Sequence, residues 1–220
     1  MTEPLFATRD LCFRDFLSYP DLTVSSGQVT FITGRSGSGK STLLKLFNAT
    51  ENPSHGTVLY RGTPLSGLSG PQILELRRDV SLVSQDSFLF PGTIRDSFQR
   101  FFTLRKKRPP KDETIRLFLD LCNVSLTPDG DTSTLSGGER QRVYIALFLS
   151  LSPRVLLLDE PTAALDTEGA RTVLDNLTGY CQRQETDLVV VSHDPALRKA
   201  FSGHTVDLDI PPEGGHGHGQ

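Results

Sequence analysis

One glycine-rich segment, residues 34–42, restricts what this chain can fold into more than any other part of the sequence. It reads Gly-Arg-Ser-Gly-Ser-Gly-Lys-Ser-Thr, follows a strand-like run at residues 28–33 and precedes an apolar helical pattern at residues 43–47. A glycine, four residues and then Gly-Lys-Ser, placed between a strand and a helix, is the pattern of a phosphate-binding loop. Glycine permits backbone angles that turn successive N–H groups toward an anion, and the following helix directs its positive end at the same anion.

We therefore expect this segment to bind the phosphates of a nucleotide. The expected binding residues are Gly34, Arg35, Ser36, Gly37, Ser38, Gly39, Lys40, Ser41 and Thr42. The Lys40 ammonium suits the β- and γ-phosphates, and the Ser41 hydroxyl suits Mg²⁺. An ordinary Gly/Ser-rich turn before a helix is the alternative, but it does not account for the lysine and the hydroxyl at these positions.

The rest of the composition limits the classes of function. A chain of 220 residues can bury a sizeable core, and its net charge of −3 gives no general attraction to nucleic acid or to an anionic membrane surface. Cys12, Cys122 and Cys181 are widely spaced and odd in number, which favours a reducing compartment over a disulfide framework. No segment resembles a signal peptide or a run of about 20 apolar residues, so we expect a role at a membrane only through a partner chain.

Strand-like and helical patterns alternate along most of the chain, which predicts an α/β fold with a mainly parallel sheet. Residues 155–158 and 188–191 are continuous apolar runs, as in parallel strands buried on both faces. Further strands are expected at residues 5–13 (an edge strand), 22–24, 57–60, 80–84 and 205–208, and helices at 71–76, 93–104, 112–122, 136–150, 167–184 and 195–201.

The middle of the chain is richer in helices, and we expect a helical subdomain over about residues 86–150 within one domain that spans residues 1–210. In the helix at 112–122, the side chains expected to pack inward are Ile115, Leu117, Phe118, Leu119 and Leu121. The basic segment 105–108 could touch lipid headgroups or a membrane-embedded partner chain, but we favour a solvated loop. Residues 211–220 are expected to be disordered; His216 and His218 could hold a metal ion there, but we favour a solvated tail.

Two acids follow the buried run at 155–158. Ligands of open α/β sheets bind beyond the carboxyl ends of the strands, which is where Asp159 and Glu160 emerge. Asp159 is expected to act on Mg²⁺, and Glu160 to act as the base that orients and polarises an attacking water. The alternative is that two acids end a strand and meet solvent.

Two further polar residues follow other predicted strands. His193 comes after the run at 188–191 and could reach the γ-phosphate edge of the same site. Gln85 follows the strand at 80–84 and could reach Mg²⁺ or the attacking water. A structural histidine is the alternative for His193.

Residues 135–142, Leu-Ser-Gly-Gly-Glu-Arg-Gln-Arg, resemble the signature sequence of ATP-binding cassette (ABC) ATPases. The order of the motifs also resembles that family: phosphate loop, Gln85, signature, Asp159 and Glu160, the segment 163–166, then His193. The resemblance covers about residues 5–208. It implies a P-loop core with a mainly parallel sheet, an N-terminal antiparallel β part and a helical arm, and an ATPase that uses ATP and Mg²⁺.

The resemblance also implies a second copy of the chain as partner. Two cassettes would face each other head to tail, so that Ser136, Gly137 and Gly138 of one copy bind the γ-phosphate held by the other. This is physically reasonable because those residues begin a helix, whose end attracts anions. Asp166 would cross between the two copies.

The chain departs from the family pattern at two places. An aromatic residue before the phosphate loop usually stacks on adenine; the N-terminal segment is short here, and Phe16 or Phe13 could take that role or belong to the core. Arg35 stands where many transport members have proline, which should leave phosphate binding intact because that loop works through backbone N–H groups.

Within the family, the chain resembles ATPase subunits of transporters, and most of all small bacterial ATPases paired with a metal-export, iron-export permease. Phe88, Leu89 and Phe90 are expected to face the permease, with the core of the helical arm as the alternative. The chain would then lie in the cytoplasm, on the inner face of the cell membrane, with no nucleic-acid partner.

Two other functions stay open from the sequence. The first is an ATPase that acts on nucleic acid or ribosomes. The second is a nucleotide-binding module that scarcely hydrolyses ATP.

Overall fold

The computed structural model describes residues 3–193 and 204–209. Its centre is a parallel sheet with strand order β10-β4-β9-β8-β7. These strands are β4 (Val29–Thr33), β7 (Val80–Val83), β8 (Val155–Asp159), β9 (Asp187–Val191) and β10 (His204–Asp207). All four pairings between them are parallel, which confirms the α/β fold expected from the sequence.

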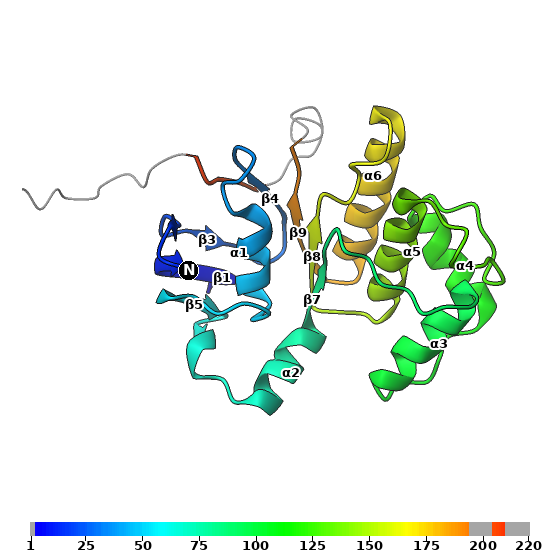
Figure 1. Cartoon of the computed structure of the whole chain (residues 1–220), viewed down its shortest axis with the longest axis horizontal. Helices are drawn as coiled ribbons and strands as arrows, with labels where there is room; N and C mark the ends of the chain where they lie inside the picture. The colour runs from blue at the N-terminus through cyan, green and yellow to red at the C-terminus, as the bar shows by residue number, and fades with distance from the viewer. Residues whose placement is uncertain (1–2, 194–203, 210–220) are drawn as a thin grey trace, which may run out of the picture.

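A second, antiparallel sheet lies beside the parallel one and is built mostly from the N-terminal part of the chain (Figure 1). Its strands are β1 (Phe6–Phe13), β2 (Leu17–Ser18), β3 (Thr23–Val24), β5 (His55–Tyr60) and β6 (Thr63–Pro64). The prediction of an edge strand at 5–13 is wrong, because β1 pairs with β5 on one side and with β2 and β3 on the other.

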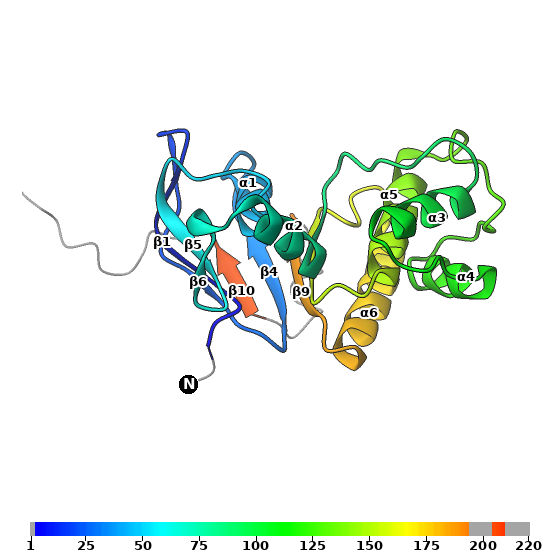
Figure 2. The ribbon, with the colours of Figure 1, turned by 90° about the horizontal axis from the view of Figure 1, so that it is seen from below.

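The helices divide between the two sides of the parallel sheet. In chain order they are α1 (Lys40–Phe47), the 3₁₀ turn Leu65–Gly67, α2 (Gly70–Asp79), α3 (Ile94–Leu104), α4 (Asp112–Leu121), α5 (Gly137–Ser150) and α6 (Thr167–Arg183). Figure 1 shows α1 between the antiparallel strands and the parallel sheet, with α5 and α6 on the opposite side and α3 and α4 beyond them. Figure 2 shows the same four helices gathered at one end of the molecule.

Strands β4, β7, β8 and β9 of the parallel sheet send their side chains into two separate apolar clusters, one on each face. In β8, Leu156 and Leu158 pack with α3 to α6, whereas Val155 and Leu157 pack with α1 and the antiparallel sheet. The same alternation places Phe31 in the first cluster and Ile32 in the second. Burial on both faces explains the continuous apolar runs in these strands.

Three local expectations from the sequence need correction. The Leu117 side chain is 63% exposed, whereas Ile115, Phe118 and Leu119 pack inward as expected. The segment 105–108 is not simply a solvated loop, because the Arg105 guanidinium donates a hydrogen bond to the Arg77 carbonyl at 3.2 Å. The helix expected at 71–76 is longer in the structure, where α2 runs from Gly70 to Asp79. The helix expected at 195–201 and the tail at 211–220, with His216 and His218, lie outside the described residues.

Among residues 3–193 and 204–209, no helix is long and apolar enough to cross a membrane.

A bulge in β1 depends on one glycine. The pairing of β1 with β5 shifts between Arg9 and Cys12, and a Cβ atom on Gly56 would lie 2.2 Å from the Asp10 carbonyl oxygen. Gly56 also has a φ of +72°, which side-chain-bearing residues adopt only with strain.

We expect Gly56→Ala to lower the free energy of unfolding by about 2 kcal/mol or more, since the added methyl group meets backbone atoms that cannot turn away. Urea unfolding followed by circular dichroism measures this. Gly67→Ala is the control, because a Cβ at Gly67 meets nothing within 4 Å. Equal destabilisation by the two variants would contradict the explanation.

Candidate functional site

The phosphate-binding loop joins the carboxyl end of β4 to the first turn of α1. Gly37 and Gly39 have φ values of +81° and +88°, so the loop uses the backbone freedom that the sequence pattern predicted. A Cβ on Gly39 would lie 2.5 Å from the Leu17 side chain and 2.6 Å from the Tyr19 hydroxyl. Glycine is therefore required at position 39 by both conformation and space.

The Lys40 side chain folds back over this loop and is almost fully buried. Its ammonium group donates hydrogen bonds to the carbonyl oxygens of Gly34 at 2.9 Å and Arg35 at 2.7 Å. Burial lowers the pKa of Lys40, while the charges of nearby carboxylates act in the opposite direction. A buried ammonium whose hydrogen-bond acceptors are neutral groups, two carbonyls and the Ser38 hydroxyl at 3.5 Å, is a favourable place for an anion.

Tyr19 supports the loop from the antiparallel sheet, and the sequence analysis missed it. Its hydroxyl donates a hydrogen bond to the Gly39 carbonyl at 2.8 Å. Burial raises the pKa of Tyr19, so the hydroxyl stays a donor at neutral pH. No local pattern marks this tyrosine, because the contact joins residues 20 positions apart through the fold.

Asp159 ends β8 beneath the phosphate-binding loop and is only 4% exposed. One of its carboxylate oxygens, Oδ1, is buried without a hydrogen-bond partner. Burial raises the pKa of Asp159, and the nearby Ser41 hydroxyl partly opposes this by favouring the charged form. A hydroxyl and a carboxylate oxygen without a partner fit the oxygen ligands that Mg²⁺ prefers.

Glu160 and His193 form a pair at the ends of neighbouring strands. The Glu160 Oε1 atom lies 3.2 Å from His193 Nε2, and the His193 backbone N–H donates to Glu160 Oε2 at 3.4 Å. Burial raises the pKa of the Glu160 carboxyl, and the charge of His193 opposes that shift. Glu160 has a φ of +50°, a strained conformation for this residue type of the kind that gathers at functional sites.

Gln141 connects the signature helix α5 to these acids and is a second residue that the sequence analysis missed. Its side-chain amide donates to the carbonyl oxygens of Asp159 at 3.3 Å and Glu160 at 3.1 Å. These bonds help to hold Glu160 in its strained conformation. The sequence feature that could have revealed Gln141 is a polar residue on the apolar, buried face of this helix.

Many of the predicted site residues line one cavity of about 450 Å³, here called the phosphate-loop cavity, but Gly34, Arg35, Ser38 and Asp159 are not in its lining. Its lining includes Phe13, Phe16, Ser36, Gly37, Gly39, Lys40, Ser41, Thr42, Gln85, Glu160 and His193. The Phe16 side chain is 77% exposed, so it does not belong to the core, whereas Phe13 is buried. The structure therefore brings Gln85, Glu160 and His193 together with the phosphate-binding loop.

The signature residues lie elsewhere. Ser136 caps α5: its hydroxyl accepts a hydrogen bond from the Glu139 backbone N–H, and the Glu139 carboxylate accepts one from the Ser136 N–H, so the two residues form a capping box. Neither Ser136 nor Gly137 nor Gly138 lines the phosphate-loop cavity. A Cβ on Gly137 would meet nothing within 4 Å, so this helix end has open space before it.

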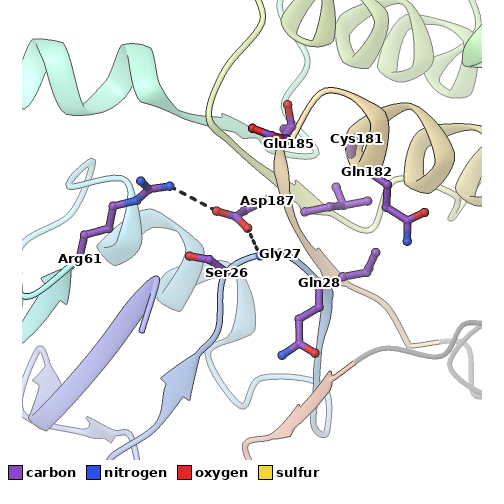
Figure 3. A pocket seen from close by; sticks show the side chains of 11 residues that line it. Ser26, Gly27, Gln28, Arg61, Cys181, Gln182, Glu185 and Asp187 are labelled. Carbon is purple, nitrogen blue, oxygen red and sulfur yellow. Dashed lines mark hydrogen bonds and ion pairs between the residues drawn. The ribbon is translucent and has the colours of Figure 1, made fainter. Parts of the chain in front are cut away.

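A second cavity, of about 530 Å³, lies at the opposite ends of β4 and β9 (Figure 3). There the buried Asp187 carboxylate accepts a hydrogen bond from the Gly27 backbone N–H at 2.6 Å and lies 3.5 Å from an Arg61 nitrogen. Burial raises the pKa of Asp187. These contacts tie the starts of the two strands to the antiparallel sheet, and they account for Asp187 without a ligand.

Comparison with known proteins identifies the relatives of this chain. The family model described as "ABC transporter" matches residues 17–163. The methionine import ATP-binding protein MetN 1 of Burkholderia pseudomallei is 35% identical over 191 residues, which cover 86% of this chain and 56% of that protein. The phosphonates import ATP-binding protein PhnC of Wolinella succinogenes is 36% identical over 197 residues, covering 85% of this chain and 72% of that protein. The chain thus spans little more than half the length of MetN 1.

Solved structures agree with this family. CbiO1 from Clostridium perfringens, part of the ABC transporter complex CbiONQ, is 29% identical, with a TM-score of 0.72 over 87% of this chain and 79% of that one. A dimeric ATP-binding cassette bound to ADP and phosphate shares the fold, with a TM-score of 0.80 at 24% identity over 92% of this chain and 94% of that one. The named relatives import methionine and phosphonates, so nothing here supports the predicted likeness to iron exporters.

The burial of Asp159 predicts a measurable effect of pH on stability. A carboxyl whose pKa is higher in the folded chain than in the unfolded chain destabilises the fold when it is charged, and this cost appears as the pH rises through the folded pKa. Asp159→Asn should therefore raise the melting temperature without nucleotide or Mg²⁺ by about 2 °C or more at pH 8, with a smaller gain at pH 5.

Thermal unfolding in the presence of EDTA, followed by circular dichroism, tests this. Asp120→Asn removes an exposed carboxylate from α4 and is the control. A gain of equal size at both pH values would show that burial of the Asp159 charge is not the cause.

Proposed function

The chain belongs to the ABC transporter family, whose ATP-binding subunits are ATPases, and we propose that it is the ATP-hydrolysing subunit of a membrane transporter. One observation carries the proposal. The Glu160–His193 pair, Gln85 and the Lys40 ammonium all border the cavity of about 450 Å³ that the phosphate-binding loop forms. This arrangement puts an acid–base pair beside a site for phosphate groups, as hydrolysis of a phosphoanhydride requires.

In this proposal the phosphate-binding loop holds the triphosphate of ATP. Its backbone N–H groups and the start of α1 bind the phosphate oxygens, and the Lys40 ammonium turns from the carbonyls of its own loop to the β- and γ-phosphates. Phe16, exposed at the rim of the same cavity, stacks on adenine.

Ser41 and Asp159 would hold Mg²⁺, with Gln85 as a further ligand, because hydroxyl, carboxylate and amide oxygens suit this ion. Bound there, the ion would neutralise part of the charge on the phosphate oxygens. The buried Oδ1 atom of Asp159, which has no hydrogen-bond partner, supports this role. In the described residues no cluster of three or more His, Cys, Asp or Glu side chains forms a metal site.

Glu160 acts on the attacking water. Its carboxylate orients the water toward the γ-phosphorus and takes up a proton as the bond from the γ-phosphorus to the bridging oxygen breaks, leaving ADP and phosphate. The raised pKa of Glu160 suits a base near neutral pH. His193, hydrogen-bonded to Glu160, fixes the direction of that carboxylate and lies at the γ-phosphate edge.

A second copy of the chain would complete the site. The start of α5 is a helix end that could bind an anion, and a Cβ on Gly137 there would meet nothing within 4 Å. This helix end does not line the phosphate-loop cavity of its own chain. Head-to-tail pairing would place Ser136, Gly137 and Gly138 of one copy on the γ-phosphate of the other, with Asp166 near the contact. ATP would then join the two copies, and hydrolysis would release them.

An apolar hollow on α3 supports a permease partner. Phe90, Gln99, Arg100, Thr103 and Leu104 line a depression of about 400 Å³. The Leu104 and Phe88 side chains are 67% and 54% exposed, whereas Leu89 between the two phenylalanines is buried. The expectation that residues 88–90 face a partner therefore applies to the phenylalanines, and Leu89 belongs to the core. Exposed large apolar side chains around a hollow are typical of an interaction site.

A basic cleft beside this hollow indicates the charge of the partner. Lys45, Arg77 and Arg105 line a space of about 260 Å³ without any carboxylate in the lining. The Nε atom of Arg77 is buried without a hydrogen-bond partner. Burial and the nearby Arg78 lower the pKa of Arg105. An acidic side chain on a segment of the permease would relieve this repulsion. If that segment is cytoplasmic, the chain would lie on the inner face of the membrane.

The permease, not the cassette, contacts the cargo, so iron forms no part of this proposal. No observation in the described part of the chain favours action on nucleic acid or ribosomes.

Replacement of the proposed base tests the activity. We expect Glu160→Gln to lower ATP turnover by about 100-fold or more, because the amide cannot accept the proton. The variant should also accumulate an ATP-bound dimer, which size-exclusion chromatography with light scattering detects. Glu168→Gln, on the exposed first turn of α6, is the matched control.

A Glu160→Gln variant with normal turnover would favour a nucleotide-binding module that scarcely hydrolyses ATP. A variant that stays monomeric with ATP, alone and with the permease, would contradict the head-to-tail dimer.

Charge reversal in the basic cleft tests the partner. Arg105→Glu should reduce co-purification with the partner permease by about tenfold or more, while ATP turnover of the isolated chain is retained. Arg108→Glu changes the same charge at an exposed position outside the cleft and is the control. Equal losses from both variants, or from neither, would remove the cleft from the interface.

A further inference from the structure

The phosphate-binding loop is held from outside by a carboxylate that lies 174 residues further along the chain. Strand β10 lies beside β4 (Figure 2), and the Leu208 N–H continues the pairing by donating to the Thr33 carbonyl at 2.9 Å. The next residue is Asp209. Its Oδ2 atom accepts a hydrogen bond from the Arg35 backbone N–H at 2.7 Å, and its Oδ1 atom lies 3.3 Å from Arg35 Nε.

The Lys40 ammonium binds the same residue from its other side. It donates to the Arg35 carbonyl at 2.7 Å, so the carboxylate and the ammonium occupy the two peptide groups of one loop residue. Because both groups bind Arg35, the Asp209 carboxylate lies near the ammonium that is meant for phosphate.

We propose that Asp209 is an internal counter-anion of the phosphate-binding loop, which weakens the binding of nucleotide and speeds its release. This inference rests on the proposed function, because it presupposes that the loop binds ATP and ADP. Asp209 accepts a hydrogen bond from a backbone N–H of the loop, as a phosphate group does. When the phosphates of a nucleotide enter, its fixed negative charge repels them and competes for Lys40.

The contact with Asp209 also involves the side chain of Arg35, which stands where many transport members of the family have proline. The Arg35 guanidinium is exposed on 86% of its side chain, and Asp209, exposed on 29%, faces it. Because the Arg35 guanidinium is the more exposed of the two groups, solvent screens its charge more strongly, and it only partly offsets the charge of Asp209. The proposed effect on nucleotide therefore comes from the field of Asp209 at Lys40 and at the phosphates, and not from stability of the loop.

Asp209→Asn separates charge from structure, because an asparagine oxygen can still accept the Arg35 N–H. We expect the variant to bind ADP about three to five times more tightly than the unchanged protein at 50 mM salt, by isothermal titration calorimetry. The gain should shrink toward none at 1 M salt, where exposed charges are screened. The melting temperature without nucleotide should stay within about 1 °C.

Two further variants complete the test. Asp209→Glu keeps the charge and should bind ADP within about twofold of the unchanged protein. Asp120→Asn removes one charge from α4, far along the chain, and should leave the dissociation constant unaltered at both salt concentrations. If Asn at position 209 prevents folding, Asp209→Ser removes the same charge and replaces it in the comparison.

An Asp209→Asn variant whose affinity for ADP equals or falls below that of the unchanged protein at low salt overturns the inference. A gain that persists at 1 M salt does so as well, because a screened charge would not be its cause. Failure of the unchanged protein to bind ADP or ATP would instead contradict the proposed function.

Discussion

The structure depends on one electrostatic constraint, which is the burial of charged groups at the carboxyl ends of neighbouring parallel strands. Asp159 and Glu160 leave β8 there, and Lys40 begins the helix that follows β4. Burial raises the pKa of both acids and lowers that of the lysine, so each group loses hydration that its protein neighbours do not fully replace. Phosphate groups and a divalent cation are the ligands that would compensate both signs of charge at once.

The features that the sequence predicted correctly are those whose interacting residues all lie within one short segment. The phosphate-binding loop and the helix that begins after Ser136 are of this kind. The residues that it missed join distant segments: Tyr19 reaches Gly39, Gln141 reaches the carbonyls at the end of β8, and Asp209 reaches the loop. Such contacts exist only once the strands and helices have packed together, and no local pattern marks them. The pairing of β1 on both sides escaped prediction for the same reason, because β5 pairs with it from far along the chain.

Two surfaces with different chemistry meet at the end of β7. Ser84 lines the basic cleft, and the next residue, Gln85, lines the phosphate-loop cavity. The chain then continues through the exposed Phe88 to α3. A partner bound in the cleft and a nucleotide bound in the cavity would thus contact adjacent residues of one segment. Because Ser84 and Gln85 are adjacent, each ligand would influence the position of the segment that the other one contacts.

Strand β8 ends at Asp159, and the side chains on its two faces pack into two different apolar clusters. Leu156 and Leu158 serve one core, and Val155 and Leu157 serve the other. Insertion or deletion of a single residue here would exchange the contents of the two cores and turn Asp159 to the opposite face of the sheet. Replacement of a single side chain in this strand leaves the alternation intact, whereas a change in its length does not. The number of residues between the packed side chains and Asp159 is therefore fixed by the fold.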